Sequence, residues 1–397
     1  MNQNHAAALN QTLTLPCGSK LKNRIAKSAM SDSLGDGAGN PTDDQINLYE
    51  RWAKGGLGLS IIGEVQATPN YAEKPGNLVL NDQSDRGQLK RLASAGATDG
   101  AQLWLQLGHA GAMADAPIST PKGPSALDLP GLTCGAFSFD EIIALPFEFA
   151  RTASIAKELG FGGVEIHAAH GFLLNQFLSP LFNRRGDAYG GSLENRMRLL
   201  LEVIDAVRDA VGPGFPIGVK LNATDQLEGG FAEDEALEVI AAVDQTTIDL
   251  IDISGGTYFP GAKSSSDRAG AGPYFLDFAE RARSKTSICL MVTGGFKTLT
   301  QAESAVASGR ADMVGMARAL VIDPELPKNW LKGERVEPPF PWFKNPPEGG
   351  VTAWFTMQIT QHARGEVGLS PNELADAIEA YADRDYARSR IWNSTFN

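Results

Sequence analysis

Cysteine is scarce in this sequence. The three cysteines, Cys17, Cys134 and Cys289, are far apart, and no two of them form a CxxC pair. This spacing argues against a disulfide framework, a structural zinc site and an iron–sulfur cluster together, because these sites draw on grouped thiols. We therefore predict no metal site and a reducing, cytoplasmic location.

Long apolar runs and excess positive charge are also missing. No segment approaches the roughly 18 uninterrupted apolar residues of a membrane span, and residues 1–14 lack the basic and apolar regions of a secretory signal. Lysine and arginine total 35 against 47 acidic residues, which gives a formal charge of -12. Nucleic acid and anionic membranes would repel such a chain, although an anionic cofactor still fits a locally basic pocket. We expect a small-molecule substrate, and neither nucleic acid nor membrane as a partner.

The clearest pattern that is present is the alternation of short apolar runs with amphipathic helical stretches. The 397 residues exceed the roughly 250 that a TIM barrel usually needs. Several runs are apolar throughout, which is typical of strands buried on both faces. We predict an α/β fold, a (β/α)8 TIM barrel, although a doubly wound open sheet produces the same alternation. The predicted strands span residues 25–30, 57–65, 101–107, 163–168, 216–221, 250–254, 288–293 and 313–316.

The helices between these strands have recognisable ends. Their starts match a capping box, in which Ser or Thr is followed three residues later by Glu or Gln, at Thr42–Gln45, Ser138–Glu141 and Thr300–Glu303. Their ends are predicted at glycines, which adopt the left-handed conformation without a Cβ penalty, at Gly56, Gly160 and Gly309.

Two stretches depart from the repeating pattern. Residues 112–136, rich in Pro, Gly and Ser, predict a loop excursion after the third strand, on the face where substrates bind. We assign residues 1–338 to the barrel domain and 339–397 to a C-terminal helical extension, with helices over 352–365 and 371–388. The extension packs on the barrel or on a partner subunit. Its aromatic residues, Trp342, Trp354 and Phe355, would suit a homo-oligomer, a dimer or larger.

Two consecutive strand ends carry the features of a phosphate site. Gly294 and Gly295 follow the seventh strand, and Gly315 and Arg318 follow the eighth. Glycine lets backbone amides approach phosphate oxygens closely, and a fixed guanidinium binds two of them. The loops after these two strands are the usual phosphate site of a barrel. The alternative is that these glycines only allow tight corners between strands and helices.

Two histidines stand three residues apart at the end of the fourth predicted strand. His167 and His170 lie in the segment 163–174, where their N–H groups could converge on one oxygen that gains negative charge during a reaction. The alternatives are a metal pair or two structural histidines that are hydrogen-bonded. A helical zinc pair prefers a spacing of four with a nearby carboxylate, which disfavours the metal.

This segment and the residues that follow it resemble the old yellow enzyme family of FMN-dependent ene-reductases. The resemblance runs from residue 15 to residue 333 and implies the barrel fold, FMN as cofactor and NADH or NADPH as electron donor. The motifs that carry it are Asn23-Arg24-Ile25, Met30-Ser31, Gln106-Leu107-Gly108-His109-Ala110-Gly111, Gly123-Pro124-Ser125-Ala126, Phe177-Leu178-Ser179-Pro180, Asn183-Arg184-Arg185, the run from Asp187 to Arg196, Gly218-Val219-Lys220-Leu221, Ser254-Gly255-Gly256, Gly294-Gly295 and the run from Ala311 to Ala319.

The resemblance also implies roles for single residues. FMN would lie across the barrel mouth, with its phosphate on Gly295, Gly315 and Arg318. Gln106 would bond the pyrimidine edge of the flavin, Lys220 would stand beside N1 and O2, and Ser31 would contact O4. His167 and His170 would hold the carbonyl or nitro oxygen of the substrate. The implied cofactor set is completed by Ala29, Met30, Glu64 and Gly294.

Simpler roles remain open for several of these residues. Lys220 could pair with a barrel carboxylate, and Gln106 could be a buried amide that satisfies backbone groups. We interpret His109 as a residue that stabilises its loop, and we expect His362, in the extension, to be solvated.

The sequence departs from the family at three places. Phe172 stands five residues after the first histidine, where the family usually has the tyrosine that protonates the substrate; a positioned acid contributes roughly 10²–10⁴-fold. Another acid or water could substitute, the substrate could need no rapid protonation, or the product could be an isomer. Ala29 replaces a frequent proline. A cysteine cluster and a second dinucleotide domain, present in larger relatives, are missing, so we expect electrons to arrive directly from a nicotinamide.

Four functions follow from these observations. The first is a reductase for electron-poor substrates such as α,β-unsaturated carbonyls, nitro compounds or quinones. Substrates that stabilise their own negative charge, such as nitro compounds, should tolerate Phe172 best. The second is a flavin-dependent isomerase or desaturase, which Phe172 favours. The third is a flavin redox sensor without turnover, and the fourth is a phosphosugar-type barrel without flavin.

Overall fold

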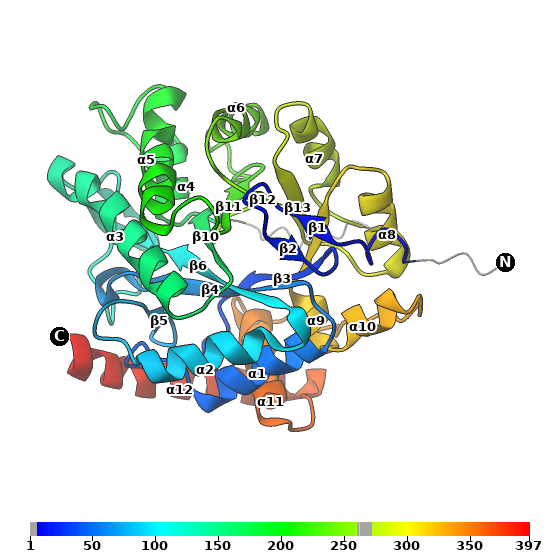
Figure 1. Ribbon diagram of the computed structural model, residues 1–397. Coiled ribbons are helices and arrows are strands. Elements are labelled where there is room, and N and C mark those ends of the chain that lie inside the picture. The colour runs from blue at the N-terminus through cyan, green and yellow to red at the C-terminus, as the bar shows by residue number, and fades with distance from the viewer. Residues whose placement is uncertain (1–5, 260–261, 263–271) are drawn as a thin grey trace.

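The computed structural model describes residues 6–259, 262 and 272–397, and its centre is a closed barrel of eight parallel strands (Figure 1). Strand β3 pairs with both β14 and β4, which closes the sheet and confirms the predicted TIM barrel. The barrel strands are β3 Ile25–Met30, β4 Leu59–Gln66, β6 Gln102–Gly108, β10 Gly163–Ala168, β11 Ile217–Asn222, β12 Leu250–Ser254, β13 Cys289–Thr293 and β14 Met313–Met316. Each predicted strand lies within two residues of one of these.

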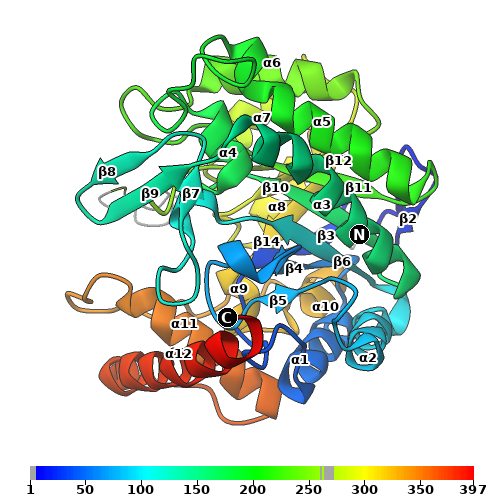
Figure 2. The same ribbon diagram turned by 90° about the vertical axis from the view of Figure 1, so that its left-hand side faces the viewer.

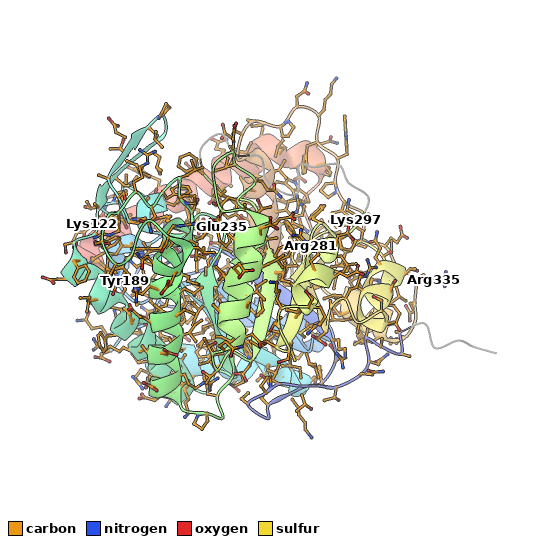
Figure 3. All side chains as sticks on the ribbon, turned by 90° about the horizontal axis from the view of Figure 1, so that it is seen from above. Lys122, Tyr189, Glu235, Arg281, Lys297 and Arg335 are labelled. Atoms are coloured by element: carbon orange, nitrogen blue, oxygen red, sulfur yellow. The ribbon has the colours of Figure 1, made fainter. Side chains whose placement is uncertain are left out.

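Helices surround the barrel. The outer ring consists of α1 Asp43–Lys54, α2 Arg86–Gly96, α3 Phe139–Glu158, α5 Leu193–Val211, α6 Glu233–Asp244, α7 Leu276–Arg283 and α8 Leu299–Ala307. Shorter helices follow some strand ends, namely α4 Leu173–Leu178, α9 Arg318–Ile322 and α10 Leu326–Leu331. Neighbouring helices are also joined by surface ion pairs. Arg281 of α7, labelled in Figure 3, pairs with Glu233 and Asp234 at the start of α6. No described helix is long and apolar enough to cross a membrane.

The predicted helix starts are only partly correct. Ser138 forms the complete capping box with Glu141, whereas Thr42 caps α1 alone, because the side chain of Gln45 bonds Asp32 instead. The third prediction is wrong by two residues, since α8 begins at Leu299 with Thr298 and Gln301 as its box.

The third predicted capping box used Glu303 as its acidic residue, but in the structure Glu303 makes a different contact. Its carboxylate accepts hydrogen bonds from the backbone N–H groups of Ala8 and Leu9, at 2.8 and 3.2 Å. This contact ties the N-terminal segment to α8. The predicted helix ends are confirmed, with positive φ at Gly56, Gly160 and Gly309.

Side chains inside the barrel form layers, because every second residue of a strand points towards the axis. The layer nearest the amino-terminal ends of the strands is apolar and contains Trp104. The residue beside this indole must be a glycine, because a Cβ added to Gly163 would lie 2.6 Å from it. The leucines of the hairpin formed by β1 (Leu13–Thr14) and β2 (Lys20–Leu21) pack against this layer. The amino-terminal end of the barrel is therefore filled by apolar side chains. The carboxyl end, called the mouth below, is where barrels usually carry their sites.

The excursion after β6 and the C-terminal extension lie on the same side of the molecule (Figure 2). The excursion contains a small sheet of β7 Lys122–Gly123, β8 Leu127–Leu129 and β9 Leu132–Ala136. The extension contains α11 Gly350–Arg364 and α12 Leu374–Phe396. Helix α12 packs on loops at the carboxyl ends of β3, β4 and β6: Trp392 is fully buried in a cluster with Ala72 and Ile118, and Arg388 donates to the carbonyl of Ser33.

The prediction for His362 is wrong. This residue lies in α11 and is half-buried, and its Nε2 atom is 2.7 Å from the carbonyl oxygen of Val321 in α9. Burial lowers its pKa. The reason is that α11 packs its histidine-bearing face against α9, the short helix after β14, instead of leaving it in water.

Candidate active site at the barrel mouth

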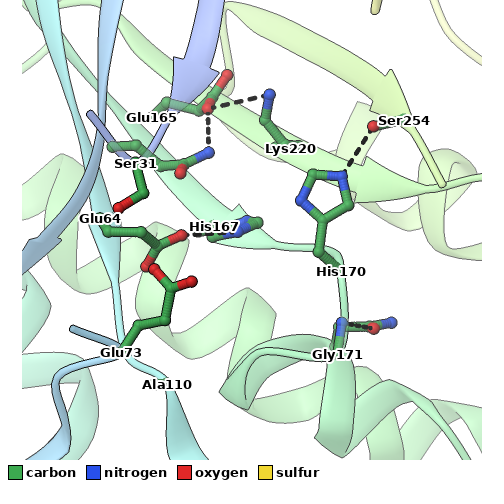
Figure 4. A network of polar contacts seen from close by, with 12 residues as sticks. Ser31, Glu64, Glu73, Ala110, Glu165, His167, His170, Gly171, Lys220 and Ser254 are labelled. Carbon is green, nitrogen blue, oxygen red and sulfur yellow. Dashed lines mark hydrogen bonds and ion pairs between the residues drawn. The ribbon is translucent and has the colours of Figure 1, made fainter. Parts of the chain in front are cut away.

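The predicted histidine pair stands at the mouth. His167 is the last residue but one of β10, His170 follows the strand with a positive φ of 62°, and the centroids of the two rings are 5.2 Å apart. The backbone N–H of His170 donates to Asn222 Oδ1 at 3.1 Å, and its Nε2 atom lies 2.8 Å from Ser254 Oγ (Figure 4). Asn222 of β11 and Ser254 of β12 therefore hold the backbone and the ring of a residue that follows β10.

The other histidine is held by an acid from β4. Glu64 Oε1 lies 3.2 Å from His167 Nε2, and both side chains are buried (Figure 4). Burial raises the pKa of Glu64 and lowers that of His167, so both groups are neutral near pH 7. The protonated carboxyl of Glu64 then donates to Nε2, which leaves the ring proton of His167 on Nδ1. This Nδ1 atom is buried and has no hydrogen-bond partner within the described residues.

A buried charged layer lies just below the histidines. Lys220 Nζ pairs with Asp252 Oδ2 and lies 3.7 Å from Glu165 Oε2, to which Gln106 Nε2 donates at 2.6 Å. Burial alone would lower the pKa of Lys220, but Asp252 and Glu165 outweigh it and raise that pKa. The ammonium group therefore stays charged. Burial in turn raises the pKa of Glu165 to about 8. The simpler roles considered for Lys220 and Gln106 can be compared with this layer. Lys220 does pair with a barrel carboxylate, that of Asp252, whereas Gln106 bonds the carboxyl group of Glu165 and not the backbone.

The end of β14 is crowded around Gly315. A Cβ at this position would lie 2.3 Å from both Ser28 Oγ and Thr293 Oγ1, two hydroxyls that are themselves 2.7 Å apart. Three residues later, the guanidinium of Arg318 lies 5.6 Å from the ring centroid of Phe355. No carboxylate forms an ion pair with Arg318 among the residues that the structure describes. This half-buried cation can therefore bind an anion.

The turn after β13 is built from two glycines with positive φ, Gly294 at 102° and Gly295 at 84°. A Cβ at Gly295 would lie 2.2 Å from the carbonyl oxygen of Gly272, and one at Gly294 would lie 3.2 Å from the ring of Tyr274. Side chains are thus excluded at both positions. The backbone is left open to a close approach by a ligand such as a phosphate.

The first strand reaches the mouth through an irregular edge. The pairing of β3 with β4 shifts register before Met30, and a Cβ at Gly63 would lie 2.4 Å from the carbonyl oxygen of Met30. Ala29 and Met30 are half-buried here, as is Ser31, whose hydroxyl accepts from Asn77 Nδ2 at 3.4 Å. Bulges of this kind commonly aim side chains at active sites.

Two further residues line the histidine side of the mouth. Phe172 is only 2% exposed and its ring centroid is 4.9 Å from that of His167, so its apolar ring fills the place beside the pair. His109 is buried, its Nδ1 atom accepts from the N–H of Gly111 at 3.0 Å, and its ring stacks on Tyr71 at 4.4 Å. These contacts fit the interpretation of His109 as a loop-stabilising residue.

Sequence reasoning missed the partners of the predicted residues. Glu165, Asp252 and Ser254 hold Gln106, Lys220 and His170, yet none of the three was given a role; Ser254 was named only within a motif. The signal was present, because Glu165 and His167, or Asp252 and Ser254, stand two residues apart in otherwise apolar strands. That spacing places them on the same face of a strand, here the inner face of the barrel.

The arrangement fits a phosphate-bearing cofactor with a polar ring. The crowded end of β14, the glycine turn after β13 and Arg318, which pairs with no described carboxylate, supply one end of such a site. The other end has buried polar atoms without partners among the described residues, namely Glu165 Oε1 and His167 Nδ1. These are the atoms that a bound ring and substrate could satisfy. Within the described residues, no group of three or more His, Cys, Asp and Glu side chains could hold a metal ion.

Comparison with known proteins identifies the family. Residues 14–336 match the model of the NADH:flavin oxidoreductase / NADH oxidase family. The chain is 32% identical to the NADH-dependent flavin oxidoreductase iliE of Neonectria sp., over 96% of this chain and 54% of that protein. It is 36% identical to the NADPH dehydrogenase of Bacillus licheniformis, over 79% of this chain and 91% of that one.

A solved structure of 2-naphthoyl-CoA reductase with 2-naphthoyl-CoA superposes with a TM-score of 0.78 and 29% identity, over 83% of this chain and 53% of that one. The chain thus spans about half the length of two of these relatives and most of the third. Together with the barrel and its mouth, the match over residues 14–336 shows that the chain belongs to the NADH:flavin oxidoreductase / NADH oxidase family, whose members bind FMN and use NADH or NADPH.

Proposed function

We propose that this protein takes hydride from NADH or NADPH through FMN and reduces an electron-poor substrate that carries an oxygen atom. The substrate class is an α,β-unsaturated carbonyl, a nitro compound or a quinone. The observation that supports this proposal most is the neighbouring pair of neutral imidazoles, His167 and His170, each held through its Nε2 atom. This leaves both Nδ1 atoms available as donors.

The cofactor would be held by residues from most strands of the barrel. Gly294, Gly295, Gly315 and Arg318 would bind the phosphate, and Gln106, Lys220, Ser31, Glu64 and the backbone at Ala29 and Met30 would surround the ring. FMN supplies the transfer of hydride from the nicotinamide to the substrate. The buried ammonium of Lys220, kept charged by Asp252 and Glu165, would stabilise negative charge on the ring edge beside it.

The histidine pair would polarise the substrate. In the tautomers in which the Ser254 hydroxyl donates to His170 Nε2 and protonated Glu64 donates to His167 Nε2, each ring presents an Nδ1–H to the same oxygen. Two such donors stabilise the negative charge that develops on a carbonyl or nitro oxygen when hydride reaches the β-carbon or the nitrogen. Phe172 beside His167 excludes water from one side of this oxygen.

A second candidate function is isomerisation or desaturation, and the observation that favours it is Phe172 itself. Without a proton at that position, the carbanion formed after hydride addition could reorganise and return the hydride, which gives an isomer and no net oxidation of nicotinamide. A redox sensor without turnover would be reduced by nicotinamide but slowly reoxidised by every acceptor.

Stopped-flow kinetics separate these functions. The purified FMN-loaded protein is reduced anaerobically with NADH or NADPH and then mixed with an enone, a nitroarene or a quinone, and the products are identified. We expect rapid reoxidation by at least one class and a loss of roughly 10²–10³-fold in His167→Ala or His170→Ala. Reoxidation that is slow with all three classes would contradict the proposal, and recovery of an isomer with no nicotinamide consumed would favour the second candidate.

A further inference from the structure

Tyr258 is joined by its backbone to the segment that carries the histidine pair. It follows β12, and its N–H donates to the carbonyl of His170 at 3.1 Å. The preceding residue, Thr257, forms an isolated parallel bridge with His170. A Cβ added to Gly171 would lie 3.1 Å from Thr257 Oγ1, so the two segments are closely packed. The position of Tyr258 relative to the histidines is therefore fixed by the main chain.

The ring of Tyr258 completes a group of four rings at the mouth. Its centroid lies 5.7 Å from that of His170 and 6.0 Å from that of Phe172. The same two rings neighbour His167, at 5.2 and 4.9 Å. Tyr258 thus borders both His170, which would hold the substrate oxygen, and Phe172, which lacks a hydroxyl.

The surroundings of the mouth change the pKa of the Tyr258 hydroxyl. Desolvation by the surrounding protein raises this pKa to about 12, so the hydroxyl keeps its proton at neutral pH. Glu73 and Glu64 add to the rise, whereas Lys220 and Arg318 oppose it. At the same time the residue is 61% exposed, whereas Phe172 is 2% exposed. A proton lost from Tyr258 can therefore be replaced from water.

Other tyrosines near the mouth are placed differently. Tyr71 packs beside the small cluster that contains Phe172, but its ring contacts are with His109 and Phe137. Tyr274 lies at the phosphate end, where its ring is near Gly294. Among the described residues, Tyr258 is the phenol whose ring neighbours the histidine pair.

We propose that Tyr258 is the catalytic acid that protonates the α-carbon of an α,β-unsaturated carbonyl, in place of the tyrosine that Phe172 has replaced. The proposal rests on the proposed function. After hydride has been added to the β-carbon, the O–H bond of Tyr258 breaks as the new C–H bond forms at the α-carbon. The phenolate then takes a proton from water. The alkene gains two electrons and two hydrogens in all, while one NADH or NADPH is oxidised and one proton is consumed.

The test compares three variants of the FMN-loaded protein with the wild type: Tyr258→Phe, Tyr71→Phe, and Tyr258→Phe combined with Phe172→Tyr. The prereduced enzymes are mixed with an enone, and the rate of reoxidation is measured. We expect a loss of roughly 10²-fold or more for Tyr258→Phe, less than twofold for Tyr71→Phe, and recovery to within about tenfold of the wild type in the double variant.

A second readout follows the proton itself. When the wild type reduces a prochiral α-substituted enone in D₂O, deuterium should enter one face of the α-carbon. Tyr258→Phe should give a mixture of both faces, because water then supplies the deuteron without a fixed direction. A merely structural role would not change this ratio, and the melting temperature and FMN affinity of each variant are measured to detect misfolding.

The outcomes separate the two proposals. An unchanged rate and an unchanged deuterium pattern in Tyr258→Phe would overturn the assignment, as would a loss in Tyr71→Phe in its place. If the wild type itself fails to reduce the enone although nicotinamide reduces its flavin, the proposed function fails and not the choice of acid. A double variant that stays as slow as Tyr258→Phe, with normal FMN binding, would also contradict the exchange of roles between the two positions.

Discussion

Glu64 and His167 form a buried pair in which a carboxyl oxygen of the first lies 3.2 Å from Nε2 of the second. Glu64 also has a positive φ of 58°, an unusual backbone for a residue with a side chain, and strain of this kind gathers at functional sites. Burial raises the pKa of this glutamate to about 8. The direction of the hydrogen bond between Glu64 and His167 therefore changes at a pH at which the enzyme can be assayed.

The sign of that dependence follows from the two protonation states. Below pH 8 the carboxyl is protonated and donates to Nε2, so Nδ1 carries the proton that a substrate oxygen needs. Above pH 8 the carboxylate accepts from Nε2, and Nδ1 becomes an acceptor that repels the oxygen. We expect the rate at which the reduced enzyme is reoxidised by a nitro compound to fall as the pH rises through about 8.

Glu64→Gln tests this prediction because an amide donates N–H at every pH. Its rate should stay level across pH 7 to 9, whereas Glu73→Gln, which alters a neighbouring carboxyl not bonded to His167, should keep the decline. A decline that persists in Glu64→Gln would assign the pH dependence to another group.

Much of the fold could be predicted from the sequence because it depends on local rules. Strands buried on both faces appear as short apolar runs, and glycines at positive φ mark helix ends, as Gly56 and Gly160 do. Helix starts were harder to predict than helix ends. The segment 298–303 contains two overlapping capping-box patterns, and only packing decides which of them forms. Glu303 instead accepts a hydrogen bond from Ala8 in the N-terminal segment. This contact joins residues almost 300 positions apart, so no local sequence pattern could have predicted it.

A second prediction concerns the charged layer. Lys220→Met would leave Asp252 and Glu165 buried without their cation, and breaking a buried pair in this way costs about 3–5 kcal/mol. We expect the free energy of unfolding in urea to fall by roughly that amount, while Lys220→Arg, which keeps the charge, loses much less. Adding Asp252→Asn to Lys220→Met should recover part of the loss. Equal stability of the wild type and Lys220→Met would show that the carboxylates are neutral in the folded protein.

Only some of the residues of the site could be predicted from the sequence. The histidines, Gln106 and Lys220 stand in motifs that resemble a known family, so they could be named. Their partners come from neighbouring strands, and which partner meets which residue depends on the register and shear of the closed barrel. Tyr258 was missed for a related reason: it follows β12, and only the bridge between Thr257 and His170 brings it to the pair.

A third prediction concerns the phosphate end of the mouth. A methyl group at Gly315 would lie 2.3 Å from the hydroxyls of Ser28 and Thr293, which bond each other and, through Thr293, Asp252. Because these hydroxyls are fixed by their own partners, Gly315→Ala must displace the end of β14, and overpacking of this kind costs about 1–3 kcal/mol. We expect FMN to bind roughly 5- to 150-fold more weakly, measured by titrating the flavin's fluorescence.

The matched control is Gly186→Ala, since a Cβ at Gly186 would meet nothing within 4 Å. That variant should bind FMN like the wild type, which would assign the effect to the crowded end of β14 and not to the loss of any glycine. If Gly315→Ala also binds FMN like the wild type while its melting temperature falls, the end of β14 supports the barrel but does not hold the phosphate, and the anion site must then be sought at Gly294 and Gly295 alone.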